Sequence, residues 1–124
     1  MDLHLHESGE MYLETILQLK LKNEYVRSID IANTMNFSKP SVSRAMKLLR
    51  EAECITIDEK GYIEFTEKGL TIAKTILNRH KVLTQLLMIV GVDQSQAEED
   101  ACKIEHVISD ETYHKIMKYV EKQS

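Results

Sequence analysis

The sequence lacks the features of a membrane, secreted or linker-like protein. Its longest unbroken apolar run is Leu86–Val90, far short of the roughly 20 residues that span a bilayer. It has only one proline and four glycines, and 43% apolar with 29% charged residues fits one compact globular unit or two small layers sharing a core. No basic stretch followed by an apolar core opens the chain. We therefore expect a cytoplasmic protein that uses no membrane as a partner.

An excess of basic residues is also absent, because 16 Lys and Arg stand against 20 Asp and Glu. This balance excludes a uniformly basic coat for nucleic acid. The charge is nevertheless uneven along the chain. Residues 1–19 have a net charge of −4, residues 20–81 of +4 and residues 82–124 of −4. A nucleic-acid surface, if present, is expected in the middle segment.

The apolar periodicity predicts a mainly α protein with one small β-hairpin. Asn36 tolerates the left-handed backbone of a tight turn, and Pro40 suits the first turn of a helix. Gly61 permits the turn of the hairpin. The expected helices are about 8–22, Ile29–Met35 capped by Ser28, about Lys39–Glu53, a long helix capped by Thr66 and ended by Gly91, Asp93 through Val107, and one opened by Ser109; the strands are Ile55–Asp58 and Tyr62–Phe65.

This order of elements predicts an N-terminal winged helix-turn-helix over residues 1–65. Residues 66–124 are expected to form an attached helical module. The third helix has Val42, Met46 and Leu49 on its inward face and a positive outer face. A solvated surface is the alternative for any isolated basic helix, but the preceding turn and the following wing favour DNA. We expect Lys39, Ser41 and Arg44 at base edges, and Ser43, Lys47 and the wing residue Lys60 at phosphates.

Cys102, Glu105 and His106 have the spacing i, i+3 and i+4, which places three types of metal ligand on one helical stripe. Glu98 lies one turn earlier on this stripe, and His80 on the long helix is a further candidate. A divalent metal would also relieve repulsion between the acidic first and fifth helices.

Each of these groups also has an ordinary structural explanation that involves no metal. A cysteine on a mostly apolar helix is usually packing, and a Glu-His pair is usually surface. The two cysteines, Cys54 and Cys102, are expected to be free thiols or metal ligands in a reducing cytosol, and Cys54 beside the strand is expected in the core.

Two other functions remain open from the residues alone. A small metalloenzyme is one, because Cys-x-x-Glu-His at Cys102 is superficially similar to an inverted zincin pattern. No nucleophile, oxyanion donor or substrate-sized glycine-rich loop accompanies it, so we expect no enzyme. The other is a winged-helix regulator that responds to a small molecule or to thiol oxidation rather than to metal.

Three segments resemble the diphtheria toxin repressor and manganese transport regulator family of metal-activated bacterial repressors. They are Glu10–Ile16 (EMYLETI), Ser38–Ser43 (SKPSVS) and Ala101–Glu111 (ACKIEHVISDE), and the likeness spans nearly the whole chain. The resemblance implies a winged helix-turn-helix followed by a helical dimerisation domain. It further implies a homodimer that binds palindromic operator DNA when loaded with metal. It also places Ser38 and Pro40 among the DNA-binding residues.

By the same resemblance, the primary metal site consists of Met11, Cys102, Glu105 and His106, as in the iron-responsive branch. Thioether and thiolate ligands suit Fe(II), Co(II), Ni(II) or Zn(II) better than Mn(II), so we expect Fe(II) as the activator.

A second metal site is expected to be weak. Glu14 and His80 match family ligands there, but Thr84 stands where the iron branch has a carboxylate and Glu98 where it has a histidine. We also expect the chain to lack the SH3-like domain that completes this site in longer relatives.

Metal is expected to act by joining the first helix, through Met11, to the fifth helix, which orients two recognition helices in the dimer. The dimer surface is expected on the last three helices. The candidates, some of which must be ordinary core, are Leu83, Leu87, Val107, Ile116 and Val120.

Overall fold

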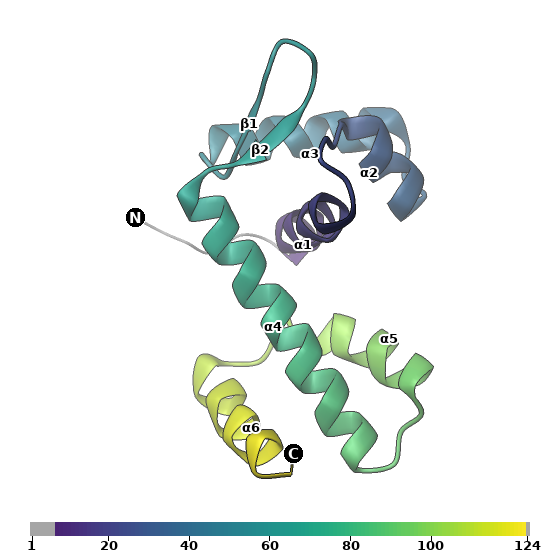
Figure 1. The fold of residues 1–124 in the computed structure, drawn as a ribbon, viewed down its shortest axis with the longest axis vertical. Coiled ribbons are helices and arrows are strands. Elements are labelled where there is room, and N and C mark those ends of the chain that lie inside the picture. Colours follow the sequence, from purple (N-terminus) through teal and green to yellow (C-terminus); the bar gives the residue numbers. More distant parts are fainter. Residues whose placement is uncertain (1–6, 124) are drawn as a thin grey trace. The chain divides into compact units, whose positions relative to one another are not determined.

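The computed structural model describes residues 7–123 and contains helices with one two-stranded antiparallel sheet (Figure 1). This confirms the mainly α fold with a small hairpin. In the described part of the chain, no helix is both long and apolar enough to cross a membrane. The elements are α1 (Glu7–Lys22), α2 (Ser28–Met35), α3 (Lys39–Glu51), β1 (Ile55–Ile57), β2 (Ile63–Phe65), α4 (Glu67–Ile89), α5 (Gln94–Ile104) and α6 (Asp110–Gln123).

The chain divides into two compact units, Met1–Lys74 and Thr75–Ser124, and the division falls inside α4. In the first unit, α2 and α3 pack on each other and on α1. Asn36 joins α2 to α3 in the left-handed conformation, with φ 57° and ψ 42°, as its side chain predicts. The buried residues of this unit include Leu13, Ile16, Val26, Ile31, Val42, Met46, Leu49, Ile55 and Ile63.

The hairpin follows α3 and forms the wing, with Ile55 opposite Phe65 and Ile57 opposite Ile63. Gly61 has φ +86°, which an L residue rarely adopts, and so permits the turn. Two hydrogen bonds connect β2 to α1 and to the segment between α1 and α2. The amide of Ile63 donates to the Val26 carbonyl at 2.8 Å, and Lys20 Nζ donates to the Ile63 carbonyl at 3.0 Å.

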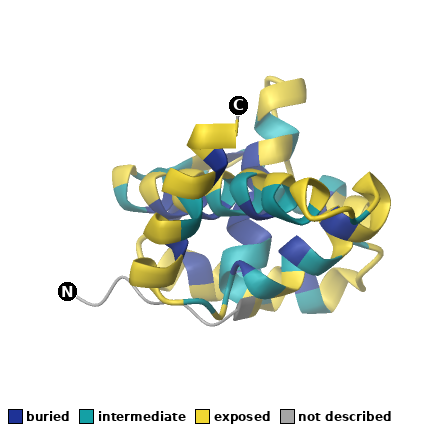
Figure 2. Cartoon of the chain, turned by 90° about the horizontal axis from the view of Figure 1, so that it is seen from below, coloured by how far each residue is buried: buried dark blue, intermediate teal, exposed yellow. Residues whose placement is uncertain are grey.

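The second unit contains the rest of α4 together with α5 and α6. Its buried residues include Leu83, Ala97, Ala101, Tyr113 and Val120. Figure 2 shows the general pattern, in which buried residues lie on the inner faces of the helices and exposed residues on the outer faces.

Several helix ends differ from the sequence-based expectation. α2 begins at Ser28 rather than after it, because Asp30 accepts the Arg27 amide at 2.9 Å and closes the helix start. α3 ends at Glu51, since Glu53 takes a positive φ of 61° that no helix allows. Thr66, in contrast, caps α4 as predicted, because its Oγ1 accepts the Gly69 amide at 3.1 Å.

The five apolar residues proposed for a dimer surface differ in how exposed they are in the single chain. Leu83 and Val120 are buried within the single chain, and Leu87 and Ile116 are half-buried. Val107 is 72% exposed. Val107 therefore remains the strongest surface candidate of the five.

Candidate metal centre and DNA-binding surface

The three candidate ligands Cys102, Glu105 and His106 lie where α5 ends. α5 stops at Ile104, and Glu105 caps it in the helical conformation with its amide 3.0 Å from the Ala101 carbonyl. His106 lies in the turn that follows. Cys102 is in the last turn of the helix, so helix and turn together supply the three side chains.

Glu105 is the centre of this cluster. Its side chain is 0% exposed, and its Oε2 lies 2.9 Å from Nδ1 of His80 on α4. Its Oε1 lies 3.3 Å from Nε2 of His106, whose side chain is also 0% exposed. Cys102 is half-buried. The Glu105 carboxylate thus lies against two imidazoles of the second unit, and the Cys102 thiol comes from the last turn of the adjoining helix.

The environment of Glu105 fits a bound cation. A buried carboxylate is costly unless its charge is balanced and its oxygens accept hydrogen bonds. Within residues 7–123, Oε1 of Glu105 is buried and accepts no hydrogen bond. Carboxylate and imidazole together suit divalent transition metals. The donor groups in contact with Glu105 are therefore of a kind that can hold such an ion.

The remaining candidate ligands are on α1 and α5. Met11 and Glu14 are on α1 in the first unit, and Met11 is half-buried whereas Glu14 is 5% exposed. Glu98 on α5 is exposed and accepts a hydrogen bond from Gln94 at 3.1 Å. The Thr84 hydroxyl donates to the His80 carbonyl at 2.7 Å, which is a hydrogen bond within α4.

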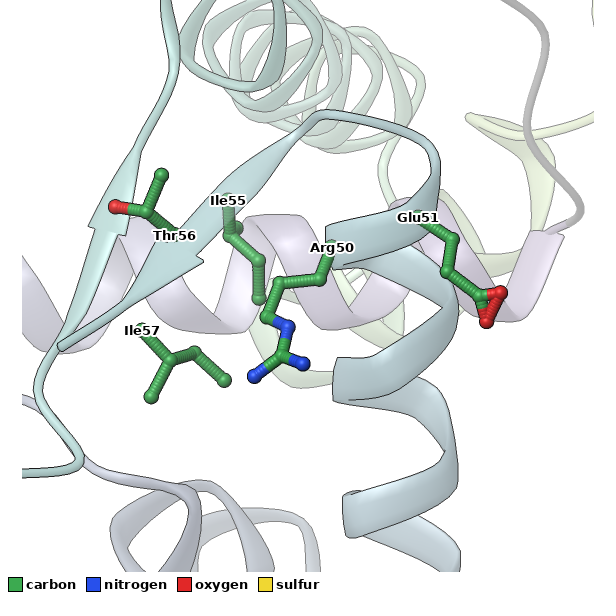
Figure 3. Close-up of a pocket in the computed structure, with 5 residues that line it drawn as sticks. All are labelled: Arg50, Glu51, Ile55, Thr56 and Ile57. Carbon is green, nitrogen blue, oxygen red and sulfur yellow. The ribbon is translucent and has the colours of Figure 1, made fainter. Parts of the chain in front are cut away.

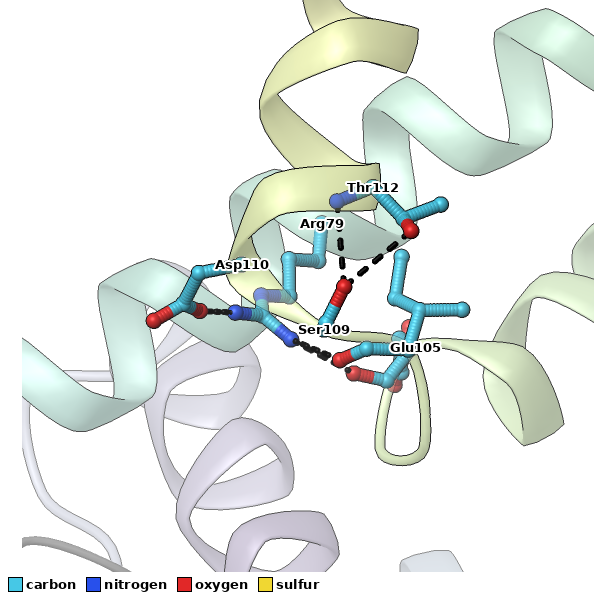
Figure 4. A network of polar contacts seen from close by, with 6 residues as sticks. Arg79, Glu105, Ser109, Asp110 and Thr112 are labelled. Atoms are coloured by element: carbon cyan, nitrogen blue, oxygen red, sulfur yellow. Dashed lines mark hydrogen bonds and ion pairs between the residues drawn. The ribbon is translucent and has the colours of Figure 1, made fainter.

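Arg79, which the sequence analysis does not single out, holds the turn between α5 and α6 (Figure 4). Its Nη1 donates to the carbonyls of Glu105, at 3.4 Å, and Ile108, at 3.2 Å, and its Nη2 forms an ion pair with Asp110. The guanidinium also lies over the Tyr113 ring, 5.2 Å from its centroid. Burial raises the pKa of the Tyr113 phenol, and the nearby Arg79 charge opposes this shift. No local sequence pattern predicts these contacts, because the partners are 26 to 34 residues away.

The start of α3 is organised by hydroxyl groups. Ser38 is the N-cap, and its Oγ accepts the Ser41 amide at 3.3 Å and donates to Ser41 Oγ at 2.9 Å. Arg44 Nη2 donates to the same Ser41 hydroxyl at 3.4 Å. Ser41 is half-buried, so its hydroxyl holds the helix start and Arg44. The exposed residues here are Ser38, Lys39, Pro40, Ser43, Arg44 and Lys47.

The wing is shaped by its own side chains. Asp58 Oδ1 accepts the amides of Lys60 and Tyr62, both at 2.9 Å. The Tyr62 ring stacks on Tyr25, with centroids 4.6 Å apart, and Arg27 lies 4.8 Å from the Tyr62 centroid. Lys60 is exposed at the tip. The first unit therefore carries exposed positive charge on both α3 and the wing.

Two surface pockets flank α3. One lies at its start and is lined by Ser28, Ile29, Lys39 and Ser43. The other lies at its end against β1, where Arg50 and Glu51 meet the strand residues Ile55–Ile57 (Figure 3). Figure 3 shows Arg50 reaching from α3 toward Ile57.

The two cysteines differ in environment, and neither forms a disulfide. Cys54 is 0% exposed, and burial raises the pKa of its thiol. The expectation that Cys54 belongs to the core is confirmed. Cys102 alone is partly accessible.

Comparison with known proteins matches both units to one family. Residues 4–69 match the N-terminal DNA binding domain of iron dependent repressors, and residues 66–123 match their metal binding and dimerisation domain. The chain belongs to the iron-dependent repressor family. This family consists of metal-dependent transcriptional repressors, so the metalloenzyme alternative is wrong.

Individual relatives agree with this assignment. The chain is 33% identical to an uncharacterized HTH-type transcriptional regulator of Methanocaldococcus jannaschii, covering 95% of this chain and 96% of that protein. It is 29% identical to the diphtheria toxin repressor of Corynebacterium diphtheriae over 92% of this chain and 51% of that protein. The structure of the manganese regulator SloR is 26% identical with a TM-score of 0.81, covering 91% of this chain and 53% of that one. The chain therefore spans about half the length of these last two relatives.

The family match confirms the predicted order of a DNA-binding domain followed by a dimerisation domain. The sequence predicts the domain boundary between residues 65 and 66. The two family domains meet at residues 66–69, and the compact units divide at Lys74 and Thr75.

Proposed function

We propose that this iron-dependent repressor family member is a homodimeric regulator that binds a palindromic operator when loaded with Fe(II), and thereby controls metal-uptake genes. The observation that carries the proposal is the buried carboxylate of Glu105, whose Oε1 accepts no hydrogen bond from residues 7–123. A cation at this oxygen would balance its charge, and its neighbours have the chemistry to complete the ligand set.

Four residues are proposed as ligands of this cation. Cys102, Glu105 and His106 supply a thiolate, a carboxylate and an imidazole from the end of α5, and Met11 supplies a thioether from α1. The two sulfur atoms make the set soft, which favours Fe(II), Co(II), Ni(II) or Zn(II) over Mn(II). The manganese regulator among the similar structures shares the fold, but metal choice depends on the ligand atoms rather than on the fold.

The proposed ligands come from both compact units, which suggests how metal regulates DNA binding. When bound, the cation would be coordinated both by Met11 on α1 and by the residues at the end of α5, and would so link the two. The α3 helices of a dimer are then held at one separation, and less free energy is lost in ordering them on DNA. Two-fold symmetry of the dimer would match a palindromic operator with half-sites about one or more helical turns apart.

The dimer is proposed to form through the second unit. Several large apolar side chains of this unit remain exposed in the single chain, and such side chains mark association surfaces when they are contiguous. They are Met88, Ile89, Val90, Val107 and Tyr119.

DNA binding is assigned to exposed residues of α3 and the wing. Lys39 and Arg44 are proposed to reach base edges, and Ser43, Lys47 and Lys60 to contact phosphates. Ser38 and Ser41 are proposed to act at the same surface, with Ser38 holding the start of α3 through its cap.

The decisive experiment is an anaerobic titration of operator binding with Fe(II), Mn(II) and chelator. We expect tight binding only with metal, and we expect His106→Ala to lose the metal response while remaining a folded dimer by circular dichroism and sedimentation. Equal operator binding with chelator and with Fe(II) would support a metal-independent winged-helix regulator instead. The same titration counts metal equivalents, and a second equivalent lost on mutation of Glu14, His80 or Glu98 would assign those residues to a second site.

A further inference from the structure

Two consecutive residues of α4 hold Glu105. His80 Nδ1 contacts the Glu105 carboxylate at 2.9 Å, and Arg79 Nη1 donates to the Glu105 backbone carbonyl at 3.4 Å. The side chain and the backbone of this residue are therefore fixed from the same helix. Because the proposed ligand atom is on Glu105, whatever fixes Glu105 also affects metal binding.

Arg79 also contacts two residues that follow Glu105 in the chain. Its second carbonyl partner, Ile108, is three residues further along the turn, and Asp110, its ion-pair partner, begins α6. His106 lies between these contact points. Carbonyls at the end of a helix lack partners within the helix, and a guanidinium can donate to several of them in one plane. Arg79 thus spans the whole turn from the end of α5 to the start of α6.

The contacts of Arg79 are shielded from water. The Arg79 side chain is 12% exposed, although its partner Asp110 is 81% exposed. Hydrogen bonds between a buried guanidinium and carbonyls lose little to competing water. The Asp110 ion pair is more exposed and is expected to contribute less.

We propose that Arg79 is a positioning residue that sets the turn 105–110 in its metal-binding shape before metal arrives. This inference rests on the proposed metal-activated function. Without Arg79, the turn would sample other conformations, and metal binding would have to restore the correct one at a cost in affinity. Outer partners that orient ligands commonly change metal affinity by about 10- to 100-fold.

The test compares Arg79→Met with the unchanged chain by anaerobic Co(II) titration, followed by visible absorption, and by amide hydrogen exchange without metal. The informative amides are those of Val107 and Ile108, which both donate to the Ile104 carbonyl within the turn. We expect Co(II) affinity to fall at least about tenfold and both amides to exchange faster in the metal-free protein. Arg79→Lys, which keeps the charge but not the planar fork, should give an intermediate affinity.

Two control variants separate positioning from general effects. Lys115→Ala removes one positive charge from an exposed position on α6, and it should leave both measurements unchanged. Val120→Ala removes buried apolar volume from α6, and it should lower stability without selectively exposing the turn amides. If Arg79→Met does not fold, Arg79→Lys decides the question by the same two measurements.

Unchanged Co(II) affinity within about twofold overturns the proposal. A lower affinity with unchanged exchange in the metal-free protein overturns it as well, because Arg79 would then act only on the bound state. Failure of the unchanged chain to bind Co(II) is a different result, since it refutes the proposed metal function itself.

Discussion

Nδ1 of His80 lies 2.9 Å from Oε2 of Glu105, and this contact joins α4 to the end of α5. From the sequence the two residues are expected in different sites, Glu105 in the primary site and His80 in a weak second one. The structure makes them direct neighbours. Loss of His80 is therefore expected to affect the primary site even if His80 binds no metal of its own.

The metal preference can be tested by hardening the ligand set. The double variant Met11→Asp with Cys102→Glu replaces both sulfur ligands by carboxylates, which suit Mn(II). We expect operator binding to respond to Mn(II) at lower concentrations than to Fe(II), the reverse of the unchanged chain. Fluorescence anisotropy with labelled operator measures both responses. Cys54→Ser serves as the control, because it removes a sulfur atom outside the site, and an unaltered metal preference in the double variant would refute the ligand assignment.

The accessibility of the two thiols gives a second prediction. Cys54 is fully buried with a raised thiol pKa, so little reactive thiolate forms there at neutral pH. Cys102 is partly accessible. We expect iodoacetamide to modify Cys102 and spare Cys54 in the metal-free folded protein, and Fe(II) or Co(II) to protect Cys102. Peptide mass spectrometry reads both sites, and modification of both in urea is the control. Rapid alkylation of Cys102 at saturating metal would exclude it as a ligand.

The DNA-binding assignment predicts different behaviour for two residues of α3. Arg44→Ala removes a proposed base contact, so it should cost about 1–3 kcal/mol on the operator and relax the sequence preference. Lys47→Ala removes a proposed phosphate contact, so it should weaken all sequences alike and reduce the salt slope by about one. Salt titrations on operator and random DNA separate these cases. Lys118→Ala, an exposed charge on α6, is the matched control, and an equal effect from it would mean that only net charge matters.

Gly69 provides a stability prediction for the first unit. A Cβ at this position would lie 1.9 Å from the Cys54 carbonyl oxygen, so the start of α4 and the chain before β1 would have to separate. Gly69→Ala should destabilise the protein by about 1–3 kcal/mol despite the better helix propensity of alanine. Urea unfolding followed by circular dichroism measures the change. Gly91→Ala tests a different cause, since no atom lies within 4 Å of its Cβ but its φ is +107°.

The fold was largely predictable because its signals are local. Periodic apolar residues, the turn residue Asn36 and the cap Thr66 all act within a few residues of their partners. The helix ends were less predictable, and α5 stops before Glu105 although apolar spacing continues to Val107. Val107 follows the helical pattern yet is 72% exposed, because a periodic pattern does not show which apolar residues are buried within the single chain.

The candidate site was predictable only in its chemistry. The spacing of Cys102, Glu105 and His106 indicated potential ligands without showing how they are supported. Arg79 and His80 reach Glu105 across 26 and 25 positions. Such contacts depend on how helices pack, and no single-sequence pattern encodes them.

The carboxylate of Asp58 orders the tip of the wing. Its Oδ1 accepts the amides of Lys60 and Tyr62, and these two bonds hold the tip in one shape in the folded protein. The entropic cost of ordering the wing tip therefore falls on folding of the protein and not on DNA binding. DNA binding should therefore need no slow rearrangement of the wing. The main effect of Asp58→Asn is expected to be a lower association rate constant for DNA.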